Sequence, residues 1–150
     1  MQILFAFGLT GLTVFIHALG TLQAIAHFSR AWQRRKEKRK ALASEFLIVR
    51  VVSILLLLHL LEAGVWAVFF MVTRLLPDFE TAVYFSLTSY TTVGYGDVVL
   101  PVSARFLGPI EAGVGILMFG WSTAIIVTAI TRIHGSRLHF ENDGADSASN

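Results

Sequence analysis

The sequence predicts an all-α membrane protein with three transmembrane helices and one shorter, re-entrant helix. Hydrophobic residues make up 55% of the 150-residue chain and charged residues 15%, whereas a soluble domain carries roughly 45–50% and about 25%. Three apolar stretches are long enough to cross a bilayer, which takes about 20 helical residues. The chain has no cysteine, so disulfides, thiol catalysis and cysteine-bound metals are excluded.

The first apolar stretch, residues 3–28, contains no Asp, Glu, Lys or Arg. A signal peptide is the competing interpretation, but it requires a preceding positive charge and a shorter apolar core. We therefore assign residues 1–29 to a retained N-terminal transmembrane helix. Residues 46–72 and 106–131 form the second and third predicted transmembrane helices.

Between the last two spans lies an apolar segment, residues 79–91, that is too short to cross a bilayer and is expected to be re-entrant. Residues 91–97 read Thr-Thr-Val-Gly-Tyr-Gly-Asp. Glycines allow backbone conformations that a Cβ forbids, and non-helical backbone at membrane depth survives only inside protein or beside water. The order is therefore spanning helix, half-length helix, extended loop and spanning helix.

Residues 92–97 closely resemble the selectivity filter of the bacterial type of potassium channel pore family, whose pore module has two transmembrane helices. The resemblance covers roughly residues 45–132, so the N-terminal helix is an addition to it. It implies a pore module at 46–132, with an outer helix, a pore helix at 79–91, a filter at 92–97 and an inner helix. It also implies a homotetramer, because four copies of the filter surround one ion path.

The resemblance assigns the ion-binding atoms to backbone carbonyls, which replace the water around potassium ions. The Thr92 hydroxyl adds the innermost ligands, and Gly94 and Gly96 permit the required backbone geometry. Potassium ions are the expected bound species, and no organic cofactor is expected. The carbonyls that form successive potassium sites belong to Thr92, Val93, Gly94 and Tyr95.

Four residues are expected to support the filter. Tyr95 is expected to brace the filter against the pore helix. Asp97 is expected to lie behind the outer mouth with Tyr84 as its aromatic hydrogen-bond partner. Thr88 departs from related simple bacterial pores, which carry a glutamate there that pairs with the aspartate behind the filter. That carboxyl pair cannot form in this chain.

Four residues within the predicted spans are gating candidates. Gly115 resembles the hinge of the inner helix, with close helix packing as the alternative. Glu62 and Glu111 are ionisable groups inside spans, which are functional by default. His59 lies three residues before Glu62, on the same helical face. The two form either a structural pair or a group that titrates between pH 5 and 8, and the second case predicts pH-dependent opening.

The N-terminal span carries His17 and His27, which we interpret as packing residues because no metal-ligand spacing links them to another histidine or acid. The span has no Lys or Arg ladder, which argues against voltage sensing. A basic run follows it and places residues 30–45 in a cytoplasmic loop, with the N-terminus outside. Residues 133–150 are expected to form a disordered cytoplasmic tail. The run can also bind anionic lipid headgroups through Arg34, Arg35, Lys36, Lys38, Arg39 and Lys40.

The sequence thus predicts a potassium-selective channel subunit that transports the ion passively as a homotetramer. No nucleotide-binding loop and no nucleophile–base pair argues for an enzyme, and no nucleic acid partner is expected. A non-conducting membrane sensor or accessory subunit with a pore-like fold is one alternative. A subunit of a potassium transporter is another. The simple build suits a bacterial inner (plasma) membrane.

Overall fold

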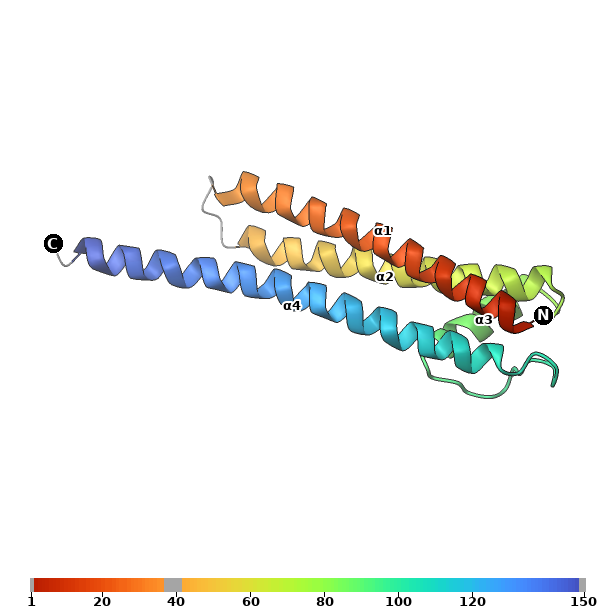
Figure 1. Ribbon diagram of the computed structural model, residues 1–150. Coiled ribbons are helices and arrows are strands. Elements are labelled where there is room, and N and C mark those ends of the chain that lie inside the picture. The colour runs from red at the N-terminus through yellow and green to blue at the C-terminus, as the bar shows by residue number, and fades with distance from the viewer. Residues whose placement is uncertain (1, 37–41, 149–150) are drawn as a thin grey trace.

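The computed structural model describes residues 2–36 and 42–148, with side chains described from 4 to 33 and from 46 to 133. The described residues form four helices and no strand (Figure 1), so the all-α prediction is confirmed. Three helices contain stretches long and apolar enough to span a membrane, namely Leu4–Gln33, Phe46–Val72 and Leu107–Ile133. In chain order the helices are α1 (Gln2–Lys36), α2 (Leu42–Val72), α3 (Phe79–Tyr90) and α4 (Leu107–Ala148).

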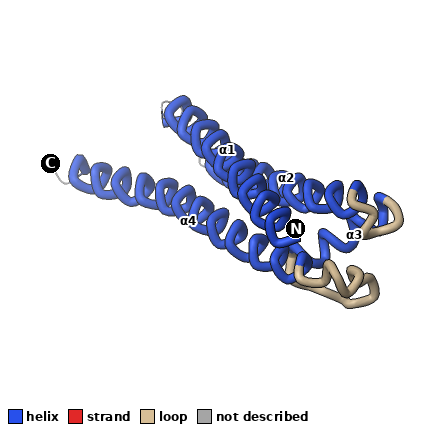
Figure 2. The backbone as a smooth tube through the Cα atoms, turned by 45° about the vertical axis from the view of Figure 1, so that its right-hand side comes forward, coloured by secondary structure: helices blue, strands red, loops and turns tan. Residues whose placement is uncertain are grey.

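The three long helices lie side by side, and the short helix α3 lies at one end of them (Figures 1 and 2). Helix α1 contacts both α2 and α4, while α3 packs against α2 and α4. The N-terminus of α1 lies at the same end as α3 and its flanking loops, whereas the C-terminus lies at the far end. The connection from α1 to α2 is therefore at the end of the bundle away from α3.

The predicted basic loop is shorter than expected, because residues 30–36 continue α1 and α2 begins at Leu42. Residues 30–36 contain Ala, Gln, Lys and Arg but no Gly or Pro, and these residues propagate a helix at little cost. Arg34, Arg35 and Lys36 are thus helical. The remaining three bases of the run lie outside the described residues.

The prediction of a disordered tail from residue 133 is also corrected, because α4 continues to Ala148. Extending an existing helix fixes one residue for each new hydrogen bond, whereas starting one is costly. No proline lies between Pro109 and the end of the chain, so nothing interrupts the propagation. The polar composition alone was misleading here.

The core has two parts. Trp66 and Phe70 of α2 are fully buried against Phe85 and Tyr90 of α3 and Met118 of α4. The Phe70 and Phe85 rings meet edge to face with centroids 5.3 Å apart, a favoured aromatic geometry. This part fixes α3 between the two long helices. The second part joins the other halves of α1, α2 and α4 through Phe28, Leu47, Val51, Leu55, Ala129 and Ile133.

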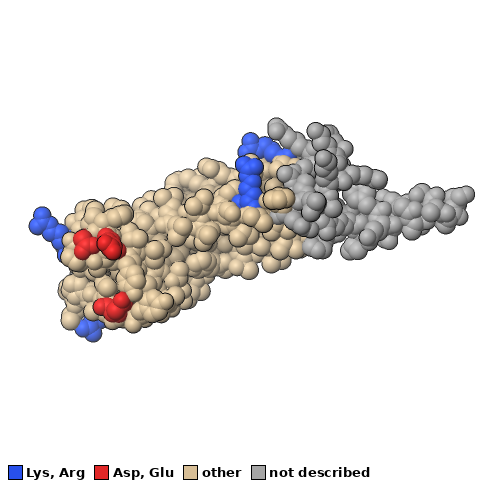
Figure 3. All heavy atoms as spheres, turned by 180° about the vertical axis from the view of Figure 1, so that it is seen from behind, with Lys and Arg blue, Asp and Glu red and all other residues tan. Residues whose placement is uncertain are grey.

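Charged groups on the surface gather at the two ends of the described bundle. Figure 3 shows one face with a long band free of Lys, Arg, Asp and Glu between them. Exposed Leu, Phe, Val and Ile side chains cover the helices within that band, as expected of a surface that faces lipid or neighbouring subunits. The exposed charged residues are Arg74, Asp78, Glu80, Asp97 and Arg105 at the α3 end and Arg30, Arg50 and Arg132 at the other.

Candidate functional site

Helix α3 is anchored at its start by Asp78, whose carboxylate accepts a hydrogen bond from the Thr81 amide at 2.8 Å. This bond holds the pKa of Asp78 below its usual value. Glu80 lies in the first turn, where an acid complements the positive end of the helix dipole. Twelve helical residues reach about 18 Å, short of a hydrocarbon core of about 30 Å, so α3 is a half-length helix as predicted.

The loop after α3 alternates in the sign of its backbone φ angle. Thr92, Gly94 and Gly96 have φ values of 63°, 53° and 79°. Val93 and Tyr95, which lie between them, are not in this left-handed region. Successive peptide groups of such an alternating chain turn the same way, so amides gather on one side and carbonyls on the other. The two glycines adopt this conformation freely.

Thr92 is the residue that sequence reasoning did not expect in the left-handed region. A positive φ is an outlier for a β-branched residue and costs about 1–3 kcal/mol, which persists only where the surroundings enforce it. The surroundings here are hydrogen bonds to the end of α3. The Thr92 amide donates to the Ser89 carbonyl at 2.9 Å, and the Gly94 amide donates to the Thr88 carbonyl at 3.0 Å.

The carbonyls of the same loop are left open. Within the described part of the chain, no hydrogen bond reaches the carbonyl oxygens of residues 92–95. The Thr92 and Gly94 amides are directed at α3, so the carbonyls of the same peptide groups, which belong to Thr91 and Val93, point away from it. Such a row of unpaired backbone oxygens is suited to bind a dehydrated cation.

The outer end of the loop is held by Tyr84, whose hydroxyl donates to Asp97 Oδ2 at 2.7 Å. The expected aromatic partner of Asp97 is therefore present. The bond lowers the pKa of Asp97 and raises that of Tyr84. Thr88 contributes through its carbonyl, since its hydroxyl is bonded to the Phe85 carbonyl.

Tyr95 is 72% exposed, so its side chain is largely uncovered in a single chain. Its expected role as a brace against a pore helix stays a prediction for the assembled pore. Val93, at 53% exposure, is open as well. The loop therefore presents side chains that only a neighbouring molecule could cover.

Gly115 lies where α4 crosses the end of α3. A Cβ at this position would overlap the Tyr90 carbonyl, with the carbonyl carbon only 2.9 Å away. The obstacle is backbone and cannot rotate aside. Close approach of α4 to the residue that ends α3 is therefore one physical role of this glycine.

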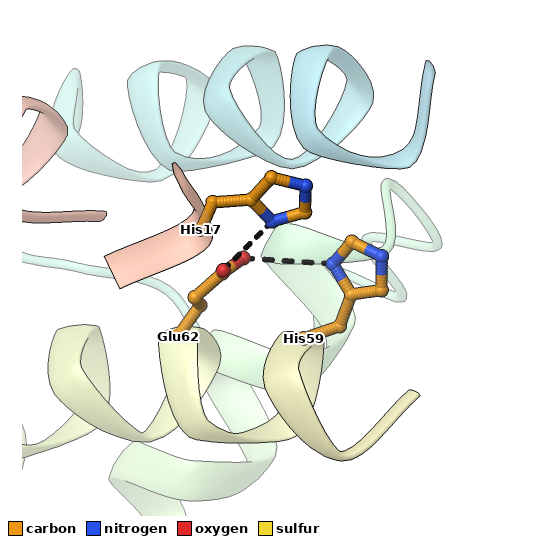
Figure 4. Close-up of side chains that lie close together, drawn as sticks. All are labelled: His17, His59 and Glu62. Atoms are coloured by element: carbon orange, nitrogen blue, oxygen red, sulfur yellow. Dashed lines mark hydrogen bonds and ion pairs between the residues drawn. The ribbon is translucent and has the colours of Figure 1, made fainter. Parts of the chain in front are cut away.

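A buried polar cluster lies behind the end of α3. Glu62 of α2, which is fully buried, accepts from Tyr90 of α3 through Oε2. Its Oε1 lies 2.8 Å from His17 Nδ1, and its Oε2 lies 3.5 Å from His59 Nδ1. Figure 4 shows the two rings and the carboxylate pointing toward one another from α1 and α2. Ser122 of α4 completes the cluster, 3.1 Å from His59 Nε2.

Sequence reasoning identified the His59–Glu62 pair but missed the rest. His17 was interpreted as a packing residue, and the structure corrects this because its ring contacts Glu62. The contact joins residues 45 positions apart, and no spacing within one helix could reveal it. An imidazole within an uncharged span was the one available signal.

Glu111 is separate from this cluster. It is fully buried, and within the described residues neither of its carboxyl oxygens has a hydrogen-bond partner. Ser86 on α3, also buried, has an unbonded hydroxyl. Glu111 thus supports α3 from behind by packing and by its proximity to the Ser86 hydroxyl, but no hydrogen bond of ordinary geometry offsets the cost of burying the carboxyl.

A protein-family model described as an ion channel matches residues 54–132, just over half of the chain. The chain belongs to this ion channel family. No curated protein and no solved structure matches it.

The match to the family model runs from within α2 through α3 and the loop into α4, and it leaves out α1. The family is one of two-helix pore proteins and includes potassium channels. Together with three helices able to span a membrane, it makes this an integral membrane ion channel, and transport rather than catalysis is its indicated role.

Proposed function

We propose that this ion channel is selective for potassium and conducts it passively through residues 92–96. The observation that carries the proposal is the alternation of φ at Thr92, Gly94 and Gly96. It supports a row of carbonyls on the side away from α3, because the Thr92 and Gly94 amides donate to carbonyls at the end of α3. Four such rows around an axis would replace the hydration shell of potassium.

The proposed ion ligands are backbone oxygens, as the sequence indicates. Asp97 and Tyr84 hold the outer end of the filter by their hydrogen bond, and the Thr88 carbonyl holds the Gly94 amide. Each of these contacts sits behind the conduction path and fixes the direction of the carbonyls. The proposed potassium ligands are the carbonyl oxygens of Thr92, Val93, Gly94 and Tyr95, with Gly96 as the conformational end of the filter.

The proposed assembly is a homotetramer. One chain supplies one row of carbonyls, and a row exposed on one side cannot enclose an ion. The exposed Val93 and Tyr95 side chains lie on the same loop and would be covered by neighbouring copies. Closed rotational symmetry is the usual arrangement of such identical subunits.

The proposed orientation puts the filter end and the N-terminus outside the cell and the C-terminus in the cytoplasm, in a bacterial inner membrane. It is supported by the position of α1, whose basic end lies away from α3 (Figure 1). Basic segments favour the cytoplasmic side. There the run from Arg34 to Lys40 would meet anionic lipid headgroups, at about 1 kcal/mol per charge.

Potassium flux into liposomes that contain the purified chain tests this function. We expect potassium and rubidium uptake that barium blocks, and none in liposomes without protein. A tetrameric preparation that passes no ions would contradict the proposal and favour a non-conducting sensor or accessory subunit. Uptake that requires a second transported ion would favour a transporter subunit.

A further inference from the structure

Five polar side chains meet where all four helices come together, and ion conduction uses none of them. His17 comes from α1, His59 and Glu62 from α2, Tyr90 from α3 and Ser122 from α4. Each is at most 6% exposed. The outer surfaces of the helices around them carry exposed apolar side chains. Placing so many polar atoms at one point requires a partner for every one of them.

The two imidazoles are arranged alike. The Nδ1 atoms of His17 and His59 both face the Glu62 carboxylate, at 2.8 Å and 3.5 Å. Their Nε2 atoms both face the hydroxyl of Ser122, at 3.5 Å and 3.1 Å. The rings thus share one partner on each side, as Figure 4 shows for the carboxylate.

One assignment of the protons leaves room for a cation at the centre of the cluster. A serine hydroxyl has one hydrogen and two lone pairs, so it can accept from both Nε2 atoms. If both rings donate their Nε2 hydrogens to Ser122, the Nδ1 lone pairs of His17 and His59 both face the Glu62 carboxylate. In that arrangement all three groups can bind one positive ion placed between them.

We propose that His17, His59 and Glu62 bind a divalent transition-metal ion, with Zn²⁺ as the best match in ligand type. Two imidazoles and one carboxylate are a common protein ligand set for this ion. The three ligand atoms lie within 4.8 Å of one another. Tetrahedral bonds of 2.0–2.1 Å would separate them by about 3.4 Å, so movements on the order of 1 Å suffice.

The remaining two residues have the roles that such a centre needs. With metal bound, Ser122 would accept the outer N–H of each imidazole and so fix both tautomers, as groups around a metal commonly do. The Tyr90 hydroxyl is bonded to Glu62 Oε2 and lies 3.4 Å from His59 Nδ1, so it holds the carboxylate in place from α3. Bound metal would join α1, which the family model does not cover, to α2 of the pore module.

Metal content of the purified full-length protein tests the site without reference to conduction. Protein stripped with a chelator is titrated with Zn²⁺ by calorimetry, and with Co²⁺ to read the visible absorption of a tetrahedral complex. We expect one Zn²⁺ per chain and tetrahedral Co²⁺ bands. The absence of stoichiometric binding by the folded protein would overturn the proposal and leave a hydrogen-bonded cluster.

Two variants separate ligation from folding. His17→Asn keeps an amide N–H that can donate to Glu62 but removes a good metal ligand, so the protein should fold and bind Zn²⁺ at least 100-fold more weakly. His27→Ala is the matched control, because it removes a histidine of α1 outside the cluster and should bind as the unmodified protein does. Equal affinity of His17→Asn and the unmodified protein would also overturn the site.

Discussion

Replacing Gly115 with alanine tests the packing of α4 against the end of α3. The new Cβ would overlap the Tyr90 carbonyl, whose carbon lies 2.9 Å away. Overpacking of this kind costs about 1–3 kcal/mol, while the better helix propensity of alanine returns about 1 kcal/mol. Because the obstacle is backbone, relief requires a shift of α3 or α4. We expect a net loss of up to about 2 kcal/mol per chain and a displaced Tyr90, with reduced conduction.

Gly113→Ala is the matched control for this substitution, since a Cβ there meets nothing within 4 Å in the described part of the chain. It should leave the free energy of unfolding unchanged or raise it by up to about 1 kcal/mol. The assay is denaturant unfolding of both variants in detergent, alongside potassium flux. Equal stability of the two variants would refute the packing argument. An altered open probability of Gly115→Ala at unchanged stability would favour the hinge.

Three further predictions concern the outer mouth, the buried acid and the topology. Tyr84 lowers the pKa of Asp97 by its hydrogen bond, so the ionised acid stabilises the fold at neutral pH. This contribution is lost as the pH falls below 3.8. Tyr84→Phe should therefore lose less stability between neutral and acidic pH, and an unchanged acid dependence would contradict this. Glu111→Leu should raise the free energy of unfolding by about 1–3 kcal/mol, because it removes an unpartnered buried carboxyl; destabilisation would show a partner. An impermeant thiol reagent on intact cells should label Gln2→Cys and not Gln33→Cys, and the reverse pattern would invert the proposed topology.

The fold was predictable because a bilayer limits the choices so strongly. Apolar stretches of more than 20 residues with few charges leave spanning helices as the economical solution, and residues 79–91 are too few to cross a bilayer. Helix ends were predicted less well. Residues 30–36 and 133–148 are polar, and polarity does not distinguish a loop from a continued helix.

Some contacts of the filter and the buried cluster could be predicted from the sequence, and others could not. The Tyr84–Asp97 bond could be predicted because the resemblance to potassium channels pairs the aspartate behind the filter with an aromatic residue of the pore helix. The strained φ of Thr92 could not be predicted, because it is imposed by hydrogen bonds that the loop amides donate to carbonyls of α3 rather than by residue type. The contact of His17 with Glu62 depends on how α1 packs across α2, and one sequence carries no record of that pairing.

Selectivity is the central claim, and the bi-ionic reversal potential of the reconstituted channel tests it most directly. Gly94→Ala, which forces a Cβ onto a backbone with φ of 53°, should abolish selective current. Gly64→Ala, which meets nothing within 4 Å, serves as its control and should not. With potassium on one side and sodium on the other, we expect a reversal potential far from zero, with the sign of a membrane that is permeable to potassium and not to sodium. A reversal potential near zero would show equal permeability and contradict it.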